Sequence, residues 1–231
     1  MHATLSTSQC TVIDDFLPAA EFAQVQGLVS RSEYKLCHEG AVSKVWRPGD
    51  GMPLHSDPLY FASREVPAQL RQAYAFHPFN NALDGLFERV HAMLKAQEAL
   101  FGSEGRDWEG FVARQYVYPA GSALSLHTDG GERYAGGFIY YCQPRWNVHW
   151  GGALIILDSR TRLAPATDFN VWLNPASEEE SALSPGVGSC IFPKANRLVL
   201  LAPDTLHLIS RVDASAGMAC RMSVAGFLLR R

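Results

Sequence analysis

Two histidines and one aspartate in the C-terminal half of the chain have the residue types of a metal site. They are His127, Asp129 and His207. Two imidazoles and one carboxylate can occupy three adjacent positions around a ferrous ion and leave the rest of its octahedron open. Because open positions on such an ion can take up dioxygen, the pattern indicates the oxygen chemistry of non-haem iron(II) sites.

The pair His127 and Asp129 comes at the end of a predicted strand-turn-strand unit. Residues 111–118 are aromatic and β-branched, which predicts a strand, and a Pro/Gly turn follows before the short apolar run 124–126. In an extended chain, residues two apart point to the same face, so both side chains can reach one metal ion. The glycines at 130–131 let the chain turn away without crowding that ion.

The chain contains a second His-x-Asp copy, His55 and Asp57. The tripeptide alone is therefore weak evidence for a metal site. This copy lies among several prolines and glycines in the stretch 47–61, which is typical of an irregular loop. We therefore prefer the later copy as the ligand pair. The stretch 47–61 is long enough to fold over the mouth of a barrel as a lid.

The third ligand is expected from a distant strand, and His207 fits that position. It lies 80 residues after His127, at the start of an apolar run that follows the predicted strand 196–201 and a turn. Alone, His207 would be interpreted as a core histidine with its ring nitrogens bonded to the backbone. In combination with the earlier pair, the pattern favours a metal ligand.

From about residue 111 to the C terminus, the chain resembles the prolyl 4-hydroxylase-like branch of the 2-oxoglutarate and Fe(II)-dependent dioxygenases. Several ordered pieces agree over about half of the chain, which is more specific than any one motif. Residues 1–110 resemble the family only weakly, through 12–18. The matching pieces are Tyr118-Pro119, His127-Thr128-Asp129, 137–141, 146–154, 196–200, His207 and 221–227.

The resemblance implies a hydroxylase with ferrous iron, and with 2-oxoglutarate and dioxygen as co-substrates. The products would be succinate, carbon dioxide and a hydroxylated C–H bond of a small molecule, an amino acid or a peptidyl residue. Ascorbate is an optional further reductant in this class. A halogenase of the same superfamily would carry a small residue in place of Asp129, so the sequence favours hydroxylation. Desaturation or ring closure stays open.

The far carboxylate of 2-oxoglutarate needs a cation, and Arg221 is the predicted one. An arginine presents a planar fork of donors that matches a carboxylate, which lysine cannot do. Ser223, two residues on, points to the same strand face and can donate a hydroxyl hydrogen bond. Arg211, nearer to His207, is the rival. Tyr118 and Tyr141 match family positions that line the co-substrate pocket, although simple packing explains Tyr141 equally well.

Composition and charge limit the classes of partner that we expect the protein to bind. The 231 residues carry a formal charge of −3 and no Lys/Arg-rich run, so we expect a small-molecule or peptide substrate and no nucleic acid. The five cysteines lack CxxC spacing, which predicts neither a disulfide framework nor a zinc site. No targeting or membrane-spanning segment is visible, so a cytoplasmic protein is expected. The composition does not indicate an oligomeric state.

The expected fold is mainly β with flanking helices: a single domain over 1–231, built as a double-stranded β-helix, or jelly roll. Residues 1–110 form a helix-rich support and 111–231 the metal-binding core, closed on itself as a barrel or sandwich. The first segment should contain an edge strand at 11–16 and helices at 18–31 and 80–100, the latter ending at Gly102. Residues 160–188 form a second irregular stretch that could contact substrate.

Two other classes of protein use the same scaffold. A jelly roll with a His/Asp/His site can be a cupin-type metal enzyme, such as an isomerase or a lyase, that uses no 2-oxoglutarate. It can also be a binding protein that has lost turnover, because fold does not dictate function. The joint presence of His127, Asp129, His207 and Arg221 argues against the loss of activity.

Overall fold

The computed structural model describes residues 3–37, 46, 48–129, 133–158 and 187–231. The described helices all lie before residue 102. They are α1 (Ala19–Val29), α2 (Ala68–Ala73), α3 (Leu83–Lys95) and α4 (Glu98–Phe101), with short 3-10 turns at Pro48–Asp50, Val148–Trp150 and Ala214–Ala216. The remaining elements are strands, so the expected mainly β fold is confirmed.

The larger sheet runs in the order β1-β2-β12-β9-β14-β7-β4-β3, and β5 pairs with β7 and β6 at its side. All its pairs are antiparallel except β5 with β6. Its strands are β1 (Leu5–Ser6), β2 (Cys10–Ile13), β3 (Lys35–Leu36), β4 (Leu54–His55), β5 (Leu59–Phe61), β6 (Ala75–Phe76), β7 (Trp108–Tyr118), β9 (Tyr134–Tyr141), β12 (Leu198–Leu201) and β14 (Arg221–Arg230). The long strands β7, β9 and β14 form its centre.

The smaller sheet runs β11-β10-β13-β8 and packs against the first. Its strands are β8 (Leu124–His127), β10 (Leu154–Leu157), β11 (Gly188–Ile191) and β13 (His207–Ile209). One buried apolar cluster takes residues from both sheets, including Ile139 and Val199 from the larger and Leu154 and Ile156 from the smaller. This is the predicted jelly roll, but no strand pair of the described residues joins the two sheets, so the expected closure is wrong. Side-chain alternation is the same in closed and open β structures, which explains the error.

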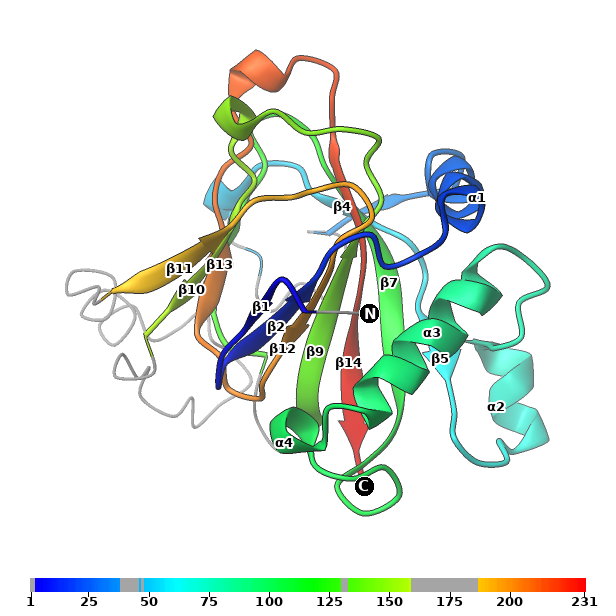
Figure 1. Cartoon of the computed structure of the whole chain (residues 1–231). Helices are drawn as coiled ribbons and strands as arrows, with labels where there is room; N and C mark the ends of the chain where they lie inside the picture. The colour runs from blue at the N-terminus through cyan, green and yellow to red at the C-terminus, as the bar shows by residue number, and fades with distance from the viewer. Residues whose placement is uncertain (1–2, 38–45, 47, 130–132, 159–186) are drawn as a thin grey trace.

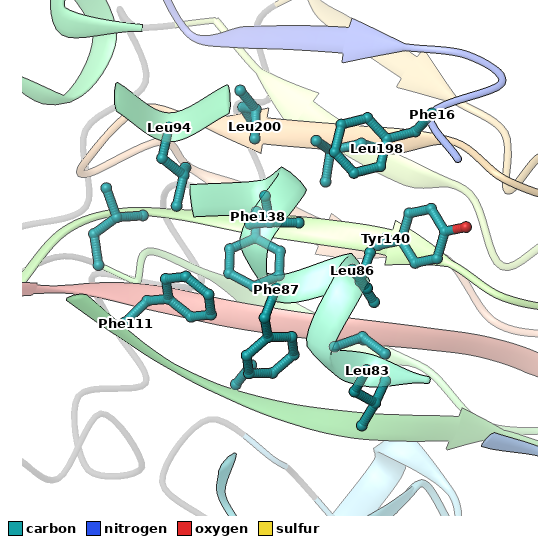
Figure 2. Packing of buried hydrophobic residues seen from close by; sticks show 14 of the residues in the cluster. Phe16, Leu83, Leu86, Phe87, Leu94, Phe111, Phe138, Tyr140, Leu198 and Leu200 are labelled. Carbon is teal, nitrogen blue, oxygen red and sulfur yellow. The ribbon is translucent and has the colours of Figure 1, made fainter. Parts of the chain in front are cut away.

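Helix α3 covers the outer face of the larger sheet, as expected from its apolar stripe. Leu83, Leu86, Phe87 and Leu94 are buried against residues of β7, β9 and β12 in one cluster. Figure 2 shows Phe87 of α3 among Phe111 and Phe138, with Leu198 and Leu200 nearby. In Figure 1 the helices α1, α2 and α3 lie on the opposite side of the larger sheet from β10, β11 and β13.

Three expectations for the first 110 residues need correction. The strand at 11–16 is β2, which is shorter and is paired on both sides, by β1 and β12, so it is not an edge. The helix at 80–100 is two helices, α3 and α4, and Gly102 with φ +74° ends the second. The stretch 47–61 is not an irregular lid, because it supplies β4 and β5, which both pair with β7.

Some expectations fall on residues outside the described ranges. These are the glycines at 130–131 and most of the stretch 160–188. All five cysteines are free thiols. No helix in the described part of the chain combines the length and apolar content needed to cross a bilayer.

Candidate metal centre and adjoining arginine pocket

Strand pairing places the two predicted histidine ligands opposite each other. His127 of β8 is the partner of His207 of β13, and their ring centroids are 4.3 Å apart. The next pair is Leu124 with Ile209, so β8 has one residue more than β13 between the two pairs. Such a bulge lets Leu124 and His127 both face the interior, and bulges are common beside active sites.

Asp129 completes the cluster from the chain that follows β8. Its Oδ1 lies 3.3 Å from His127 Nε2 and its Oδ2 lies 3.4 Å from His207 Nε2. One ligand atom from each residue lies within 4.8 Å of the other two. Within the described residues this is the one group of three or more such side chains with metal-site spacing. The three donors suit an ion with several open coordination positions.

Backbone carbonyls fix the orientation of both imidazoles. His127 Nδ1 lies 2.7 Å from the carbonyl oxygen of Ser125, and His207 Nδ1 lies 2.8 Å from that of Thr205. Because a carbonyl oxygen only accepts, each Nδ1 carries the donated proton. With one proton on Nδ1, each Nε2 is the ring atom left to bind a metal ion, which is the tautomer that metal-binding histidines need.

The charges of this cluster are strongly coupled. Burial disfavours protonation of His127, but the hydrogen bond to Asp129 outweighs it and raises the pKa of the imidazole. Burial and the neighbouring His127 lower the pKa of His207 to about 4. Burial opposes ionisation of Asp129, yet the two histidines hold the pKa of its carboxyl below the usual range. A cation that binds here meets an ionised carboxylate and competes with a proton for His127.

A second layer behind the histidines comes from Asp50, which sequence reasoning missed. Asp50 is 2% exposed, and its Oδ1 accepts a hydrogen bond from Ser125 Oγ at 2.7 Å. Its backbone oxygen also accepts from Ala123 N at 2.9 Å. Asp50 thus holds the strand whose Ser125 carbonyl orients His127. No local signal marks it, because it lies in a Pro/Gly-rich stretch without a ligand motif.

Arg221 forms a separate pocket with the other three predicted co-substrate residues. Its side chain is fully buried at 0% exposure. Its guanidinium carbon lies 4.9 Å from the ring centroids of both Tyr118 and Tyr141. Nη1 donates to Ser223 Oγ at 3.4 Å and Nη2 to the hydroxyl of Tyr141 at 3.3 Å, while Nε donates to Gly152 O at 2.9 Å.

This pocket adjoins the strands that carry the histidines. Tyr118 packs in one apolar cluster with Leu124 of β8 and Ile209 of β13, at the opposite ends of those strands from His127 and His207. No carboxylate of the described residues forms an ion pair with Arg221. A buried cation without an anion is costly, so the pocket is suited to an anionic ligand.

The rival Arg211 has a different environment. It is exposed, and its guanidinium donates to the backbone oxygens of Gly121 and Gly49. Tyr140, next to Tyr141, faces the helix side of the sheet, where its hydroxyl donates to Asn196 Oδ1 at 2.8 Å. The Tyr140-Tyr141 pair therefore points to opposite faces, and only Tyr141 reaches the arginine.

The earlier His-x-Asp copy does not form a comparable cluster. His55 lies on β4 and is buried, with Nδ1 2.7 Å from the carbonyl oxygen of Ser56. Asp57 is exposed and pairs with Lys35 at 2.7 Å. The two side chains thus have separate partners, as expected when we preferred the later copy.

Comparisons with known proteins agree with this architecture. No protein-family model matches the chain, and no curated protein matches it in sequence. Among solved structures, a Pseudomonas putida prolyl-4-hydroxylase matches with a TM-score of 0.58 at 18% identity, covering 96% of this chain and 93% of that one. A prolyl hydroxylase in complex with a hypoxia inducible factor peptide fragment, from Trichoplax adhaerens, matches at 0.57 and 16%, covering 96% and 84%.

A third similar structure holds ligands. HygX from Streptomyces hygroscopicus, with nickel, 2-oxoglutarate and hygromycin B bound, matches with a TM-score of 0.55 at 14% identity, over 96% of this chain and 83% of that one. Identities this low establish the fold and not the activity. The chain has the jelly-roll fold of the prolyl hydroxylases and other 2-oxoglutarate and Fe(II)-dependent oxygenases.

Proposed function

We propose that the protein is a 2-oxoglutarate and Fe(II)-dependent dioxygenase that hydroxylates a C–H bond of a small molecule, amino acid or peptidyl residue. The observation that carries the proposal is the pairing of two sites in one jelly roll. A His/Asp/His cluster with metal-site spacing lies on strands that adjoin a buried arginine without a carboxylate partner among the described residues. A cupin-type enzyme would have no use for the second site.

In this proposal His127, Asp129 and His207 hold the iron. Bound ferrous iron supplies the redox chemistry that couples dioxygen and 2-oxoglutarate to substrate oxidation, with ascorbate as an optional reductant. The two Nδ1 hydrogen bonds keep both imidazoles aligned, so little reorganisation is needed when the metal binds. A bound cation would compete with a proton for His127.

Arg221 would bind the far carboxylate of 2-oxoglutarate. Its guanidinium already has a fixed plane between two tyrosine rings, so little side-chain entropy is lost on binding. Ser223 and Tyr141 contact it and can turn their hydroxyls to the same carboxylate. The fold neighbours support a substrate range that includes peptides and small molecules, since one holds a peptide fragment and another holds hygromycin B with 2-oxoglutarate.

The decisive experiment compares His207→Ala with His55→Ala. Both residues are buried histidines, but only His207 belongs to the cluster. We expect His207→Ala to lose stoichiometric Fe(II) and the iron-dependent release of succinate from 2-oxoglutarate, while circular dichroism shows a folded jelly roll. His55→Ala should keep both properties. Full iron occupancy in His207→Ala would refute the ligand assignment.

The parent protein tests the reaction class itself. Succinate release that requires 2-oxoglutarate, iron and dioxygen together is expected. If succinate forms under none of these conditions while metal still binds, the protein is a cupin-type enzyme or a binding protein. With an accepted substrate, labelled dioxygen should leave one labelled oxygen atom in the product; an oxidised product without label would indicate desaturation or ring closure.

A further inference from the structure

A half-buried arginine, Arg114, lies on the same sheet face as the candidate co-substrate pocket. On β7, Arg114, Tyr116 and Tyr118 alternate with residues that pack against the helices, such as Phe111 and Ala113. Tyr116 and Tyr118 pack against the smaller sheet, so Arg114, two residues earlier, faces it as well.

Strand register gives the position of Arg114 along that face. Arg114 is opposite Ala225 of β14, which is opposite Ile139 of β9. The row on one side holds Tyr116, Ser223 and Tyr141, which include the predicted co-substrate residues. The row on the other side ends at Gly137, where an added Cβ would lie 3.8 Å from Asp129 Oδ2. Since opposite residues share a face, the row of Arg114 runs between these two rows.

The guanidinium of Arg114 is only partly used by the protein. Nη1 lies 2.8 Å from the carbonyl oxygen of Ser56 and 3.0 Å from His55 Nδ1. Among the described residues, Nη2 and Nε have no hydrogen-bond partner, and no carboxylate lies within ion-pair distance. An arginine carries five N–H donors, so a free edge remains. By contrast, several arginines elsewhere contact a carboxylate, namely Arg64, Arg89, Arg106 and Arg197.

Aromatic side chains lie on the same sheet face as Arg114. Tyr60 is opposite Val112, so it shares the face of Arg114, and it stacks on Phe76 with ring centroids 5.1 Å apart. Tyr134 stacks on Phe227 of β14 at 4.9 Å. The positive charge of Arg114 is felt by the hydroxyls of both Tyr60 and Tyr116, and Tyr116 is also within range of Asp129.

We propose that Arg114 binds a carboxylate of the substrate and so determines substrate class: a compound that carries an acid group next to an apolar or aromatic part. The inference rests on the proposed function, which assigns Arg221 to 2-oxoglutarate. Arg221 is fully buried and Arg114 is half-buried, and neither forms an ion pair with a carboxylate among the described residues. One 2-oxoglutarate bound at Arg221 leaves the free edge of Arg114 available to a second anion, and its planar fork suits a carboxylate.

Binding of simple probes tests the inference without turnover. The protein is loaded with Zn(II) in place of iron and saturated with 2-oxoglutarate, and ligand-observed NMR then measures phenylacetate against its neutral counterpart phenylacetamide. We expect phenylacetate to bind about tenfold more tightly or better, the scale of a hydrogen bond to a charged group. Equal affinities, or no binding of either probe, would overturn the proposal. In Zn(II) protein without 2-oxoglutarate, displacement of phenylacetate when 2-oxoglutarate is added would mean that phenylacetate binds at Arg221 instead.

Variants distinguish a role of Arg114 in phenylacetate binding from a role in folding. Arg114→Gln should lower phenylacetate affinity to that of phenylacetamide, and Arg114→Lys, which keeps the charge, should retain part of it. The matched control is Arg211→Gln, an arginine that contacts backbone carbonyls at the surface. Zn(II) content and 2-oxoglutarate affinity are measured in every variant. Unchanged phenylacetate binding in a folded Arg114→Gln protein would refute only the role of Arg114. If the parent protein does not bind 2-oxoglutarate at all, the proposed function itself is refuted.

Discussion

The substitution Arg221→Lys tests the co-substrate pocket because it keeps the positive charge and removes the planar guanidinium. Arg221 is fully buried between the rings of Tyr118 and Tyr141, each 4.9 Å from its guanidinium carbon. It donates three hydrogen bonds, to Gly152 O, Ser223 Oγ and the Tyr141 hydroxyl. A lysine ammonium at this position has three donors on a flexible stem and no flat face to stack between the rings.

The size of the effect follows from what the lysine cannot do. Loss of one arm of a bidentate carboxylate contact corresponds to a hydrogen bond to a charged group, about 1.5–3 kcal/mol. The dissociation constant of 2-oxoglutarate should therefore rise about 10- to 150-fold. The fold should lose about 1–2 kcal/mol as well, because the bond to Gly152 O and the stacking on two rings disappear.

Anaerobic titration of 2-oxoglutarate into the Fe(II) protein measures this affinity directly. Iron content should stay at the parent level in Arg221→Lys, since no ligand atom is changed. The control is Arg211→Lys, in which affinity for 2-oxoglutarate should stay within about twofold of the parent because surface polar substitutions change little. An unchanged affinity in Arg221→Lys would contradict the pocket assignment, and a loss confined to Arg211→Lys would transfer the role to that residue.

Three further substitutions test the support of the site and of the fold. Asp50→Ala removes both oxygens that accept from Ser125, so Fe(II) affinity in chelator competition should fall about 10- to 100-fold, and an unchanged affinity would count against a positioning role. Asn196→Ala breaks three buried hydrogen bonds at a residue with φ +59°, so urea unfolding should show a loss of about 3 kcal/mol. At Glu104, burial opposes ionisation, but three hydrogen-bonding side chains outweigh it and lower the pKa of the carboxyl to about 2. Its stabilisation is complete above the unfolded value of 4.5 and is lost as pH falls toward 2, so the stability advantage of the parent over Glu104→Gln should shrink between pH 6 and pH 3.

Local patterns in the sequence predicted the elements that depend on neighbouring residues. The apolar stripe that includes Leu83, Leu86 and Phe87 has the period of a helix, and α3 buries those residues. The run 111–118 alternates as a strand must, and β7 covers it. His127 and Asp129 are separated by one residue, so their common face follows from strand geometry alone. Their roles as ligands, and those of the co-substrate residues, stay predictions.

Patterns failed where strand pairing decides the structure. The stretch 47–61 carries the prolines and glycines of a loop, yet β4 and β5 form because β7 is long enough to offer both of them an unpaired edge. A two- or three-residue strand has little propensity of its own, and its partner supplies the stability. Asp50 was missed for the same reason, since its contact with Ser125 exists only after that stretch has folded against β8.

Arg221 and Arg114 show that strand register limits what the sequence alone can predict. Arg221 could be proposed because a family pattern and the residue two positions later mark it within a single strand. Arg114 has no such mark, because its neighbours Ala225 and Ile139 come from strands separated from it by more than 20 residues of chain, and a slip of one residue in the pairing of β7 would turn it toward the helices. A metal site that needs a fixed set of donors leaves a short motif in the chain. A substrate surface spread over β7, β14 and β9 leaves no motif, only the alternation of side chains between the two sheet faces. Packing of the sheet explains that alternation equally well.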